Sequence, residues 1–373
     1  MPAFTELGLK QIWSGFSAKL FLYYLLWLTR PAVLKNHLAK KKYPPVTVNK
    51  LNYRQGGVVR AATIQSRLAL VQDVREYVDK MYQHTEDAVR QGAQLVVFPE
   101  DNAAHLLGLL PVISKLPTES TLDQALATLR DNPISIGEIF AYLTPVTKQV
   151  YFTLFQTLAK SFGVHIMGGS ILISNEVWDK GSSRAPQQQV VNAAYLFAPT
   201  GQLVGRQLKA HLLPVEAEWG ISCGCDLQVF DTPLGNLAFP VCMDATYFET
   251  FRILAHRGAD IVLVPTANPA KYNFWKALRG TWPRVQETPV YGVTSTLIGE
   301  VLGIELSGRA AIYAPFELTP KGDGVLAQAP DPYQEAVVVA NLDLSALQQY
   351  RQESQLWQRL NRKLIAKYLP ELY

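Results

Sequence analysis

The sequence predicts an α/β protein in which β-sheets pack on each other and helices cover their outer faces. Short apolar runs typical of strands alternate with amphipathic stretches typical of helices, and some strands are joined as in hairpins. Of the 373 residues, 48% are hydrophobic and 18% are charged, so the chain can bury a sizeable core. This length fits one large domain with extensions, or two domains.

Residues 1–56 differ in composition from the rest, and we expect a basic, aromatic-rich extension followed by a linker. Residues 1–44 carry seven basic side chains and one acidic side chain, a charge of +6, whereas the remainder sums to −2. Residues 9–29 are apolar and aromatic-rich, and a basic run follows. Such a helix fits three roles. It could bind a membrane surface, or pack on its own domain or on a partner. Although Lys19 interrupts it, it could also span a membrane, which takes about 20 residues. We expect residues 9–42 to bind a membrane surface.

The main pattern begins at Gly57. Residues 58–65 predict a strand, residues 71–91 an amphipathic helix and residues 95–98 a second strand. Strand, helix and strand within about 40 residues are typical of a βαβ unit. The apolar stretch 105–113 comes next, in a part of the chain without clear periodicity, and it fits either a core helix or a lid over a substrate.

The remaining elements follow from the same patterns. Residues 148–161 predict a helix. Further strands are predicted at residues 164–173, 190–198, 260–265, 291–298, 309–314 and 335–341. The tail 344–373 predicts an amphipathic helix that packs on another subunit or, less readily, on a membrane. Its apolar side consists of Leu356, Trp357, Leu360, Leu364 and Tyr368.

Cys242 directly follows an apolar run, residues 237–241, that predicts a short buried strand. A cysteine at the C-terminal end of a strand, before a polar turn and a helix, stands where open α/β sheets place their chemistry. Buried structural cysteines are also common. This stretch alone therefore leaves a catalytic and a structural role open.

Glu100 and Lys209 also follow predicted strands or hairpins, in the stretches Phe98-Pro99-Glu100 and Leu208-Lys209-Ala210-His211. Together with Val241-Cys242-Met243-Asp244, these stretches resemble the nitrilase, or carbon–nitrogen hydrolase, superfamily, whose signature is a Glu, a Lys and a Cys in that chain order. The resemblance covers the domain that we expect at residues 57–343. Supporting segments are residues 168–170, 252–268 and 307–312.

The resemblance implies a four-layer α-β-β-α sandwich that dimerises into eight layers. It also implies that Cys242 is a nucleophile that forms a thioester with an amide substrate. Because a thiol is mostly protonated at neutral pH, it needs a base, and Glu100 matches the family's general base. Lys209 matches the lysine that stabilises the oxyanion, together with a backbone N–H near Met243. An ordinary ion pair between Glu100 and Lys209 is the alternative.

Glu216 resembles the family's second carboxylate, which helps to orient the lysine and the substrate. The spacing after Pro214 differs from the family pattern, so Glu218 is a possible substitute. We expect Met243, Asp244, Tyr247 and Asn268 to contact the substrate.

The residues after Cys242 depart from the family pattern. Amidase-like branches often continue Cys-Tyr-Asp-x-Arg-Phe-Pro-Glu, and here the arginine and the proline are missing from residues 242–249. Nitrile-cleaving branches tend to have Cys-Trp-Glu, whereas this chain has Met243-Asp244. The sequence therefore favours amide hydrolysis over nitrile hydrolysis.

Three functions fit these observations. The first is an amidase for a small-molecule amide, which the N-terminal segment and the stretch 105–113 suggest is lipophilic and membrane-delivered. The second is an N-acyltransferase that uses the same acyl-enzyme, and the third is a non-catalytic membrane-recruited scaffold. We expect a cytoplasmic protein, peripheral on the cytoplasmic membrane face, that forms a homodimer or a higher homo-oligomer.

The sequence gives no reason to expect a metal, a cofactor or nucleic acid. The three cysteines do not form a C-x-x-C pair, and no H-E-x-x-H motif occurs. Three cysteines in a chain of this length also do not form a disulfide framework, which favours a reducing compartment. The main domain is slightly acidic and lacks a basic stripe.

Overall fold

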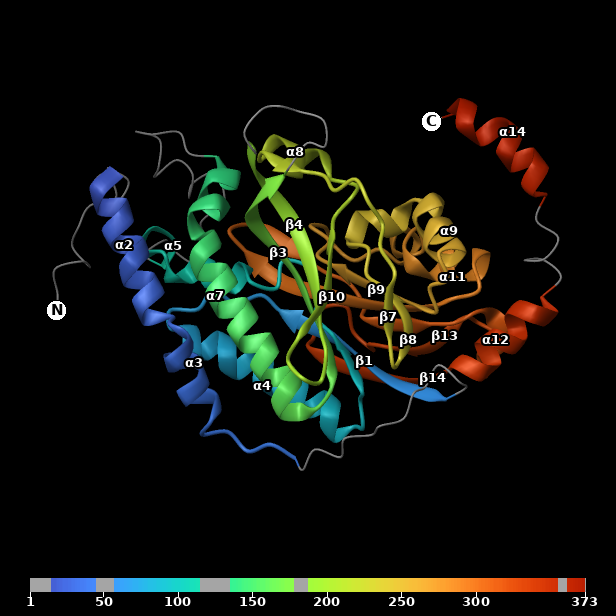
Figure 1. Cartoon of the computed structure of the whole chain (residues 1–373), viewed down its shortest axis with the longest axis horizontal. Helices are drawn as coiled ribbons and strands as arrows, with labels where there is room; N and C mark the ends of the chain where they lie inside the picture. The colour runs from blue at the N-terminus through green and yellow to red at the C-terminus, as the bar shows by residue number, and fades with distance from the viewer. Residues whose placement is uncertain (1–14, 45–56, 115–134, 178–186, 355–360, 373) are drawn as a thin grey trace.

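The computed structural model describes residues 15–44, 57–114, 135–177, 187–354 and 361–372 (Figure 1). Its strands are β1 Val58–Arg67, β2 Leu95–Val97, β3 His165–Val177, β4 Gln187–Phe197, β5 Leu203–Leu208, β6 Ile221–Ser222, β7 Phe230–Thr232, β8 Gly235–Ala238, β9 Ile261–Thr266, β10 Tyr291–Val301, β11 Ile304–Leu306, β12 Ala311–Tyr313, β13 Val325–Gln328 and β14 Ala336–Asp343. The longer helices are α2 Gly15–Leu28, α3 Pro31–Leu38, α4 Val74–Arg90, α7 Ile136–Phe162, α9 Phe248–His256, α11 Thr281–Glu287, α12 Leu344–Glu353 and α14 Arg362–Leu372. Short helical segments are η2 Ala104–Leu109, α5 Pro111–Ser114, α8 Pro214–Glu218, η3 Cys242–Thr246, α10 Phe274–Ala277 and η4 Phe316–Leu318.

The described strands form one continuous hydrogen-bonded sheet in the order β5-β4-β3-β2-β1-β10-β9-β8-β7, with β6, β11, β12, β13 and β14 attached to it. Strand β1 lies at its centre, parallel to β2 and β10 and antiparallel to β14. Because β2, β8 and β9 each run parallel to a neighbour, the residues that follow their carboxyl ends can lie together at one edge of the sheet.

Alternating side chains divide the sheet into two facing halves. In β1, Val59 and Ala61 enter one core and Ala62 and Ile64 enter another. The first core also receives apolar side chains from β2, β8, β9 and β10, so it fills the space between the two halves. Helices α4 and α7 cover the outer face of one half, and α9 and α11 cover the other. The predicted four-layer α-β-β-α sandwich is thus confirmed; its stacking into an eight-layer dimer stays a prediction.

The N-terminal helices α2 and α3 pack on the domain. Phe21 and Leu25 of α2 are buried in the same core as α7. The Tyr142 hydroxyl donates a hydrogen bond to the carbonyl of Ala18 at 2.6 Å, and Gln149 Nε2 donates to that of Leu26 at 2.9 Å. Within the described part of the chain, no helix is both long enough and apolar enough to cross a membrane. The membrane-span alternative therefore has no support there.

Helix α7 begins at Ile136, twelve residues before the predicted helix. The prediction was wrong because Pro145 lies inside it, and proline usually ends helices. A capping box starts the helix: Glu138 N–H donates to Ser135 Oγ, and Ser135 N–H donates to the Glu138 carboxylate. Burial of its apolar face against β3 and β4 compensates for the proline.

After β14, the chain forms two helices. Asp343 caps α12 by accepting hydrogen bonds from two N–H groups, and Leu344 and Leu347 pack in the core between the sheet halves. In α14, by contrast, Leu364 and Tyr368 are exposed. The other apolar tail positions, Leu356, Trp357 and Leu360, lie outside the described residues. Packing of the tail on a second subunit stays a prediction.

Candidate active site

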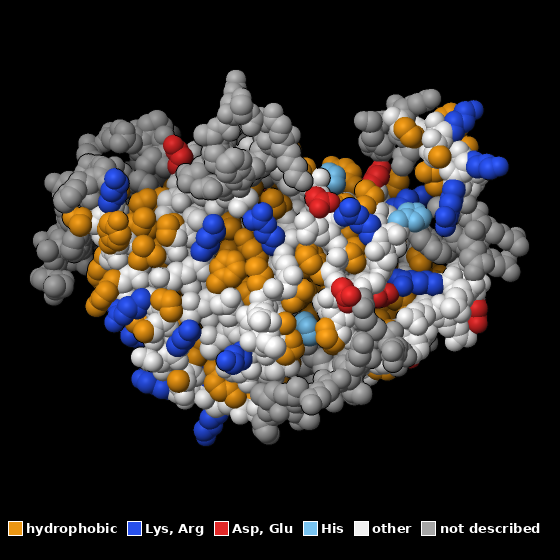
Figure 2. Space-filling model, viewed as in Figure 1, with side chains coloured by type: hydrophobic (Ala, Val, Ile, Leu, Met, Phe, Trp, Pro, Cys, Tyr) orange, Lys and Arg blue, Asp and Glu red, His pale blue; other side chains and the backbone are white. Residues whose placement is uncertain are grey.

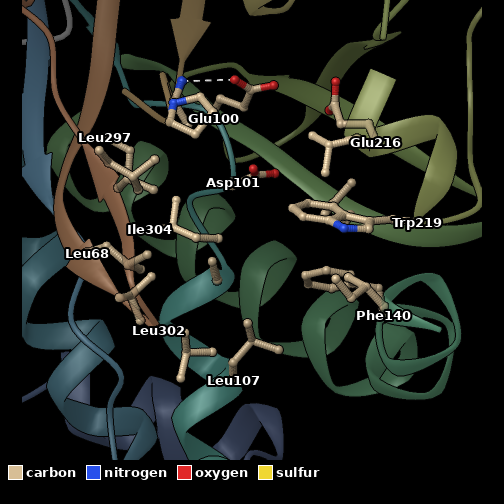
Figure 3. Close-up of a pocket in the computed structure, with 18 of the residues that line it drawn as sticks. Leu68, Glu100, Asp101, Leu107, Phe140, Glu216, Trp219, Leu297, Leu302 and Ile304 are labelled. Carbon is tan, nitrogen blue, oxygen red and sulfur yellow. Dashed lines mark hydrogen bonds between the residues drawn. The ribbon is translucent and has the colours of Figure 1, made fainter. Parts of the chain in front are cut away.

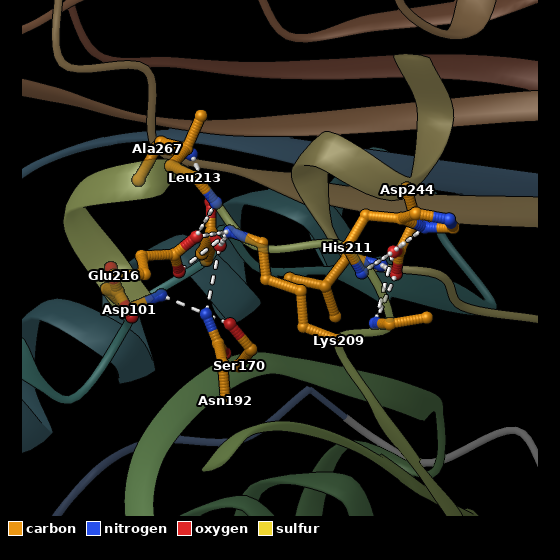
Figure 4. Close-up of polar contacts among 12 residues, drawn as sticks. Asp101, Ser170, Asn192, Lys209, His211, Leu213, Glu216, Asp244 and Ala267 are labelled. Atoms are coloured by element: carbon orange, nitrogen blue, oxygen red, sulfur yellow. Dashed lines mark hydrogen bonds and ion pairs between the residues drawn. The ribbon is translucent and has the colours of Figure 1, made fainter. Parts of the chain in front are cut away.

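The structure brings Glu100, Lys209 and Cys242 together at the ends of three strands. Glu100 follows β2, Lys209 follows β5, and Cys242 is the first residue of η3, beyond β8. Lys209 Nζ donates hydrogen bonds to Glu100 Oε1 at 2.8 Å and to Glu216 Oε2 at 2.7 Å (Figure 4). These three charged side chains are almost fully buried, with Lys209 only 1% exposed. Buried charges of this kind are found where they are paired.

The second oxygen of Glu100 is also occupied. Its Oε2 accepts a hydrogen bond from Ala267 N–H at 2.9 Å, and Oε1 accepts another from Asn192 Nδ2 at 3.0 Å. Glu216 Oε2 accepts a hydrogen bond from Leu213 N–H at 2.7 Å. These bonds fix both carboxylates around the ammonium group of Lys209.

Burial and charge shift the pKa values of the three groups. Burial, then Glu216, raises the pKa of Glu100, while Lys209 opposes the shift. Burial alone would lower the pKa of Lys209, but Glu100, Cys242 and Glu216 together raise it, so the side chain stays an ammonium. Burial, then the charge of Glu100, raises the pKa of the Cys242 thiol well above its usual value, with Lys209 opposing. The thiol is therefore protonated at neutral pH, and Glu100 lies close enough to affect its pKa.

Cys242 has a φ of 46°, which is uncommon for a residue other than glycine. The N–H of Asp244 donates to the carbonyl of Val241, the residue before η3, at 3.0 Å. The N–H of Met243 therefore lies in the opening turn of the helix, where backbone donors lack acceptors within the helix itself. This turn can present a backbone donor beside the sulfur.

Asp244 joins the cysteine turn to the lysine strand. Its fully buried carboxylate accepts hydrogen bonds from the N–H groups of Val241 at 2.9 Å, Ala210 at 3.1 Å and His211 at 2.7 Å. It also contacts His211 Nδ1 at 2.8 Å, and the imidazole stacks on Tyr247 with ring centroids 4.4 Å apart. The structure thus surrounds Asp244 with protein donors that position Cys242 relative to Lys209.

A cavity of about 750 Å³ opens beside Glu100, Lys209 and Glu216 (Figure 3). Its other described walls are almost entirely apolar. They include Leu68, Leu107, Phe140, Trp219, Leu297 and Ile304. The stretch 105–113 contributes to one wall through η2 and α5, while its opposite side packs in the core.

The predicted site residues differ in their relation to this cavity. Glu100, Lys209 and Glu216 line it. Glu218 also lines it but is exposed and has no described bond to Lys209, so the geometry favours Glu216 as the second carboxylate. Cys242, Met243, Asp244, Tyr247 and Asn268 are not among its described lining residues, and Asn268 is exposed. Their contact with substrate stays a prediction.

Other residues at the site were not predicted from the sequence. Asn192 and Ala267 hold Glu100, and Asp101 and Trp219 line the cavity. The position of Asp101 directly after Glu100 was the available signal. The remaining three depend on contacts between distant segments.

Known proteins are similar to this chain in sequence and in fold. A sequence model described as carbon-nitrogen hydrolase matches residues 60–352. A probable hydrolase, YhcX, from Bacillus subtilis is 27% identical over 83% of this chain. The match covers 55% of that relative, so this chain spans about half of the relative's length. The human omega-amidase NIT2 is 24% identical, with 82% of this chain and 96% of the relative covered. The solved amidase from Nesterenkonia sp. AN1 has a TM-score of 0.56 and 20% identity, with 83% of this chain and 99% of the neighbour covered.

The layered sheet has the α-β-β-α sandwich architecture, and Glu100, Lys209 and Cys242 lie together at its edge. The match over residues 60–352 shows that this chain belongs to the carbon–nitrogen hydrolase family, also known as the nitrilase superfamily.

Proposed function

We propose that this protein hydrolyses the C–N bond of an amide through a thioester on Cys242. The observation that supports this most is the buried arrangement of Glu100, Lys209 and Glu216 beside the protonated thiol. Glu100 takes the proton of the thiol, and the sulfur attacks the amide carbonyl. The ammonium of Lys209 and the N–H of Met243 stabilise the oxyanion, and one such donor contributes about 3 kcal/mol.

Collapse of the intermediate breaks the C–N bond. Protonated Glu100 gives its proton to the departing amine and leaves a thioester on Cys242. Glu100 then takes a proton from water, which attacks the thioester and releases a carboxylic acid and the thiol. Glu216 keeps the ammonium of Lys209 in place through both steps.

The substrate in this proposal has a lipophilic acyl group. The cavity supports this, because apart from five charged side chains its described walls are apolar. Each methylene group buried there would contribute about 0.8 kcal/mol. We expect kcat/KM to rise at least 10-fold across primary amides from acetamide to octanamide.

A pocket-filling variant tests the acyl site. Leu107→Trp should shift the preference toward short amides, whereas Leu203→Trp, at an exposed position outside the cavity, should not. If acetamide is the best substrate of the wild-type protein, the lipophilic acyl group is wrong. Product analysis with and without added amines separates hydrolysis from acyl transfer, and turnover only with an amine would favour the acyltransferase.

Membrane delivery of the substrate is part of the same proposal. Helix α2 exposes Leu20, Tyr23, Tyr24 and Trp27, with Trp27 58% exposed. The Arg30 guanidinium lies 4.5 Å from the centroid of the Trp27 ring. Figure 2 shows hydrophobic side chains gathered around this helix with basic side chains beside them. Aromatic and basic side chains together suit a membrane interface, and here the cytoplasmic face.

Vesicle sedimentation tests this surface. We expect binding to vesicles that contain anionic lipid, and at least 10-fold weaker binding for a Tyr23→Ser, Trp27→Ser double variant. Because both side chains are exposed, the fold should be unaffected. Phe274→Ser, Trp275→Ser, an equally exposed aromatic pair on α10, is the matched control. Equal binding by all three proteins would exclude this role for α2.

The proposed assembly is a homodimer or a larger homo-oligomer. Exposure of Leu364 and Tyr368 on α14 supports a contact with a second copy. Sedimentation of the full chain and of a Leu364→Ser, Tyr368→Ser variant tests this. A monomeric wild-type protein would contradict it.

A further inference from the structure

Asp101 is a half-buried residue whose carboxyl group the proposed thioester chemistry does not use. It directly follows Glu100 and lines the same cavity. Its Oδ1 atom is buried without a hydrogen-bond partner among the described residues. In Figure 3 the carboxyl group faces the open space that Trp219 and Ile304 also line. A buried acceptor without a partner costs about 1–3 kcal/mol, so its presence needs an explanation.

The backbone holds Asp101 in this position at a conformational cost. Its φ is 52°, in the left-handed region. Its N–H donates to Ser170 Oγ at 3.3 Å, and the N–H of Asn102 donates to the Ser170 carbonyl at 2.9 Å. Three described residues other than glycine have a positive φ, and two of them are Asp101 and the proposed nucleophile Cys242. Strain of this kind gathers at functional sites.

The charges around the cavity are unbalanced. The described lining residues carry four carboxyl groups, those of Glu100, Asp101, Glu216 and Glu218, and one cation, Lys209. The ammonium of Lys209 is already bonded to Glu100 and Glu216. Asp101 therefore has no cation of its own among the described residues, and a ligand could supply one.

We propose that Asp101 binds a protonated amine carried by the acyl part of the substrate, close to the scissile carbonyl. This deepens the proposed function and rests on it: the substrate class becomes amides of apolar amino acids. Asp101 directly follows Glu100 and lines the same cavity, which places an ammonium bound there near the reacting carbonyl. The apolar walls receive the hydrophobic side chain, and Asp101 receives the ammonium.

Electrostatics supports this assignment. Burial, then the charge of Glu100, raises the pKa of Asp101 well above its usual range, with Lys209 opposing and Glu216 adding to the shift. The protonated form of the carboxyl group is therefore favoured when no ligand is bound. A bound ammonium would replace that proton and form a charge-assisted hydrogen bond, which is about twice as strong as a neutral one.

Calorimetric titration in a Cys242→Ala background tests the proposal without requiring turnover. The probes are leucinamide and 4-methylpentanamide, which lacks the amine. The titration is run at a pH below the amine pKa of leucinamide, about 7.8, so that the amine is protonated. We expect leucinamide to bind about 10- to 100-fold more tightly. Asp101→Asn and Asp101→Gly should remove this preference, so that each variant binds the two probes with similar affinity. Asparagine and glycine both tolerate the positive φ, and Asp323→Asn, at an exposed turn, is the control.

The outcomes are distinct. Equal affinity of the two probes, or a preference that survives in Asp101→Asn, would overturn the role of Asp101. A third outcome is that substitution of Asp101 abolishes the amine preference but the wild-type protein, with Cys242 intact, hydrolyses neither amide. This result would support the amine site and refute the proposed hydrolysis.

Discussion

At the level of single residues, Lys209 is the centre of the site, because it neutralises two buried carboxylates. Lys209→Met keeps much of the side-chain volume but leaves Glu100 and Glu216 without their cation. We expect the free energy of unfolding at neutral pH to fall by about 3–5 kcal/mol, measured by urea denaturation. Lys321→Met, at an exposed position, should change it by less than about 0.5 kcal/mol. Equal effects would mean that the buried pairing contributes little to stability.

Glu100 should set the acidic limb of the pH–rate profile. It must be ionised to accept the thiol proton, so kcat/KM falls as pH drops through its pKa. Because burial and Glu216 raise that pKa, the midpoint should lie above 4.5, the ordinary value for glutamate. Glu100→Gln should lower kcat/KM by about 10²- to 10⁴-fold. A midpoint at or below the ordinary value would contradict the described environment of Glu100.

At the level of elements, the turn after β2 depends on a close approach to β3. Gly169 has a φ of 78°, and a Cβ atom there would collide with the Pro99 carbonyl oxygen, next to Glu100. Gly220 has a similar φ of 82° but nothing within 4 Å of such an atom. Gly169→Ala should therefore destabilise the protein by at least about 2 kcal/mol more than Gly220→Ala. Similar melting temperatures would show that the β2 turn adapts freely.

His105, in η2, couples stability to pH. Burial lowers its pKa to about 4, so it stays neutral in the folded protein while the unfolded chain binds a proton near its ordinary pKa of 6.5. The stability that this residue contributes is therefore fully present above about pH 6.5, and it is lost as the pH falls from 6.5 toward 4. His105→Phe should reduce the slope of unfolding free energy against pH in this window by up to about 1.4 kcal/mol per pH unit.

Most elements could be predicted from apolar periodicity, which is local in the sequence. Strand β1 and helix α4 lie within a few residues of the predicted bounds. The first part of α7 was missed because Pro145 opposes a helix locally, and burial against the sheet outweighs it. Local signals fail where tertiary packing decides the conformation.

At the level of the whole molecule, motif order in the sequence indicated Glu100, Lys209 and Cys242, and the structure places them together. For Asp101 the only sequence signal was its position after Glu100, because its φ and the missing partner of its Oδ1 atom depend on the packing of β3 beside β2. The cavity was equally hidden, since Leu68, Phe140 and Ile304 are far apart in the chain. Specificity therefore depends on tertiary contacts that sequence patterns do not encode locally.

Intact-mass spectrometry of an acyl-enzyme tests the central claim most directly. The purified protein is mixed with octanamide, quenched in acid and weighed, with Cys242→Ala and Glu100→Gln as controls. We expect the wild-type protein to gain the mass of one octanoyl group, located on Cys242 by peptide mapping, and neither variant to do so. Hydrolysis of octanamide without any such adduct, or an adduct that persists in Cys242→Ala, would contradict a thioester mechanism at Cys242.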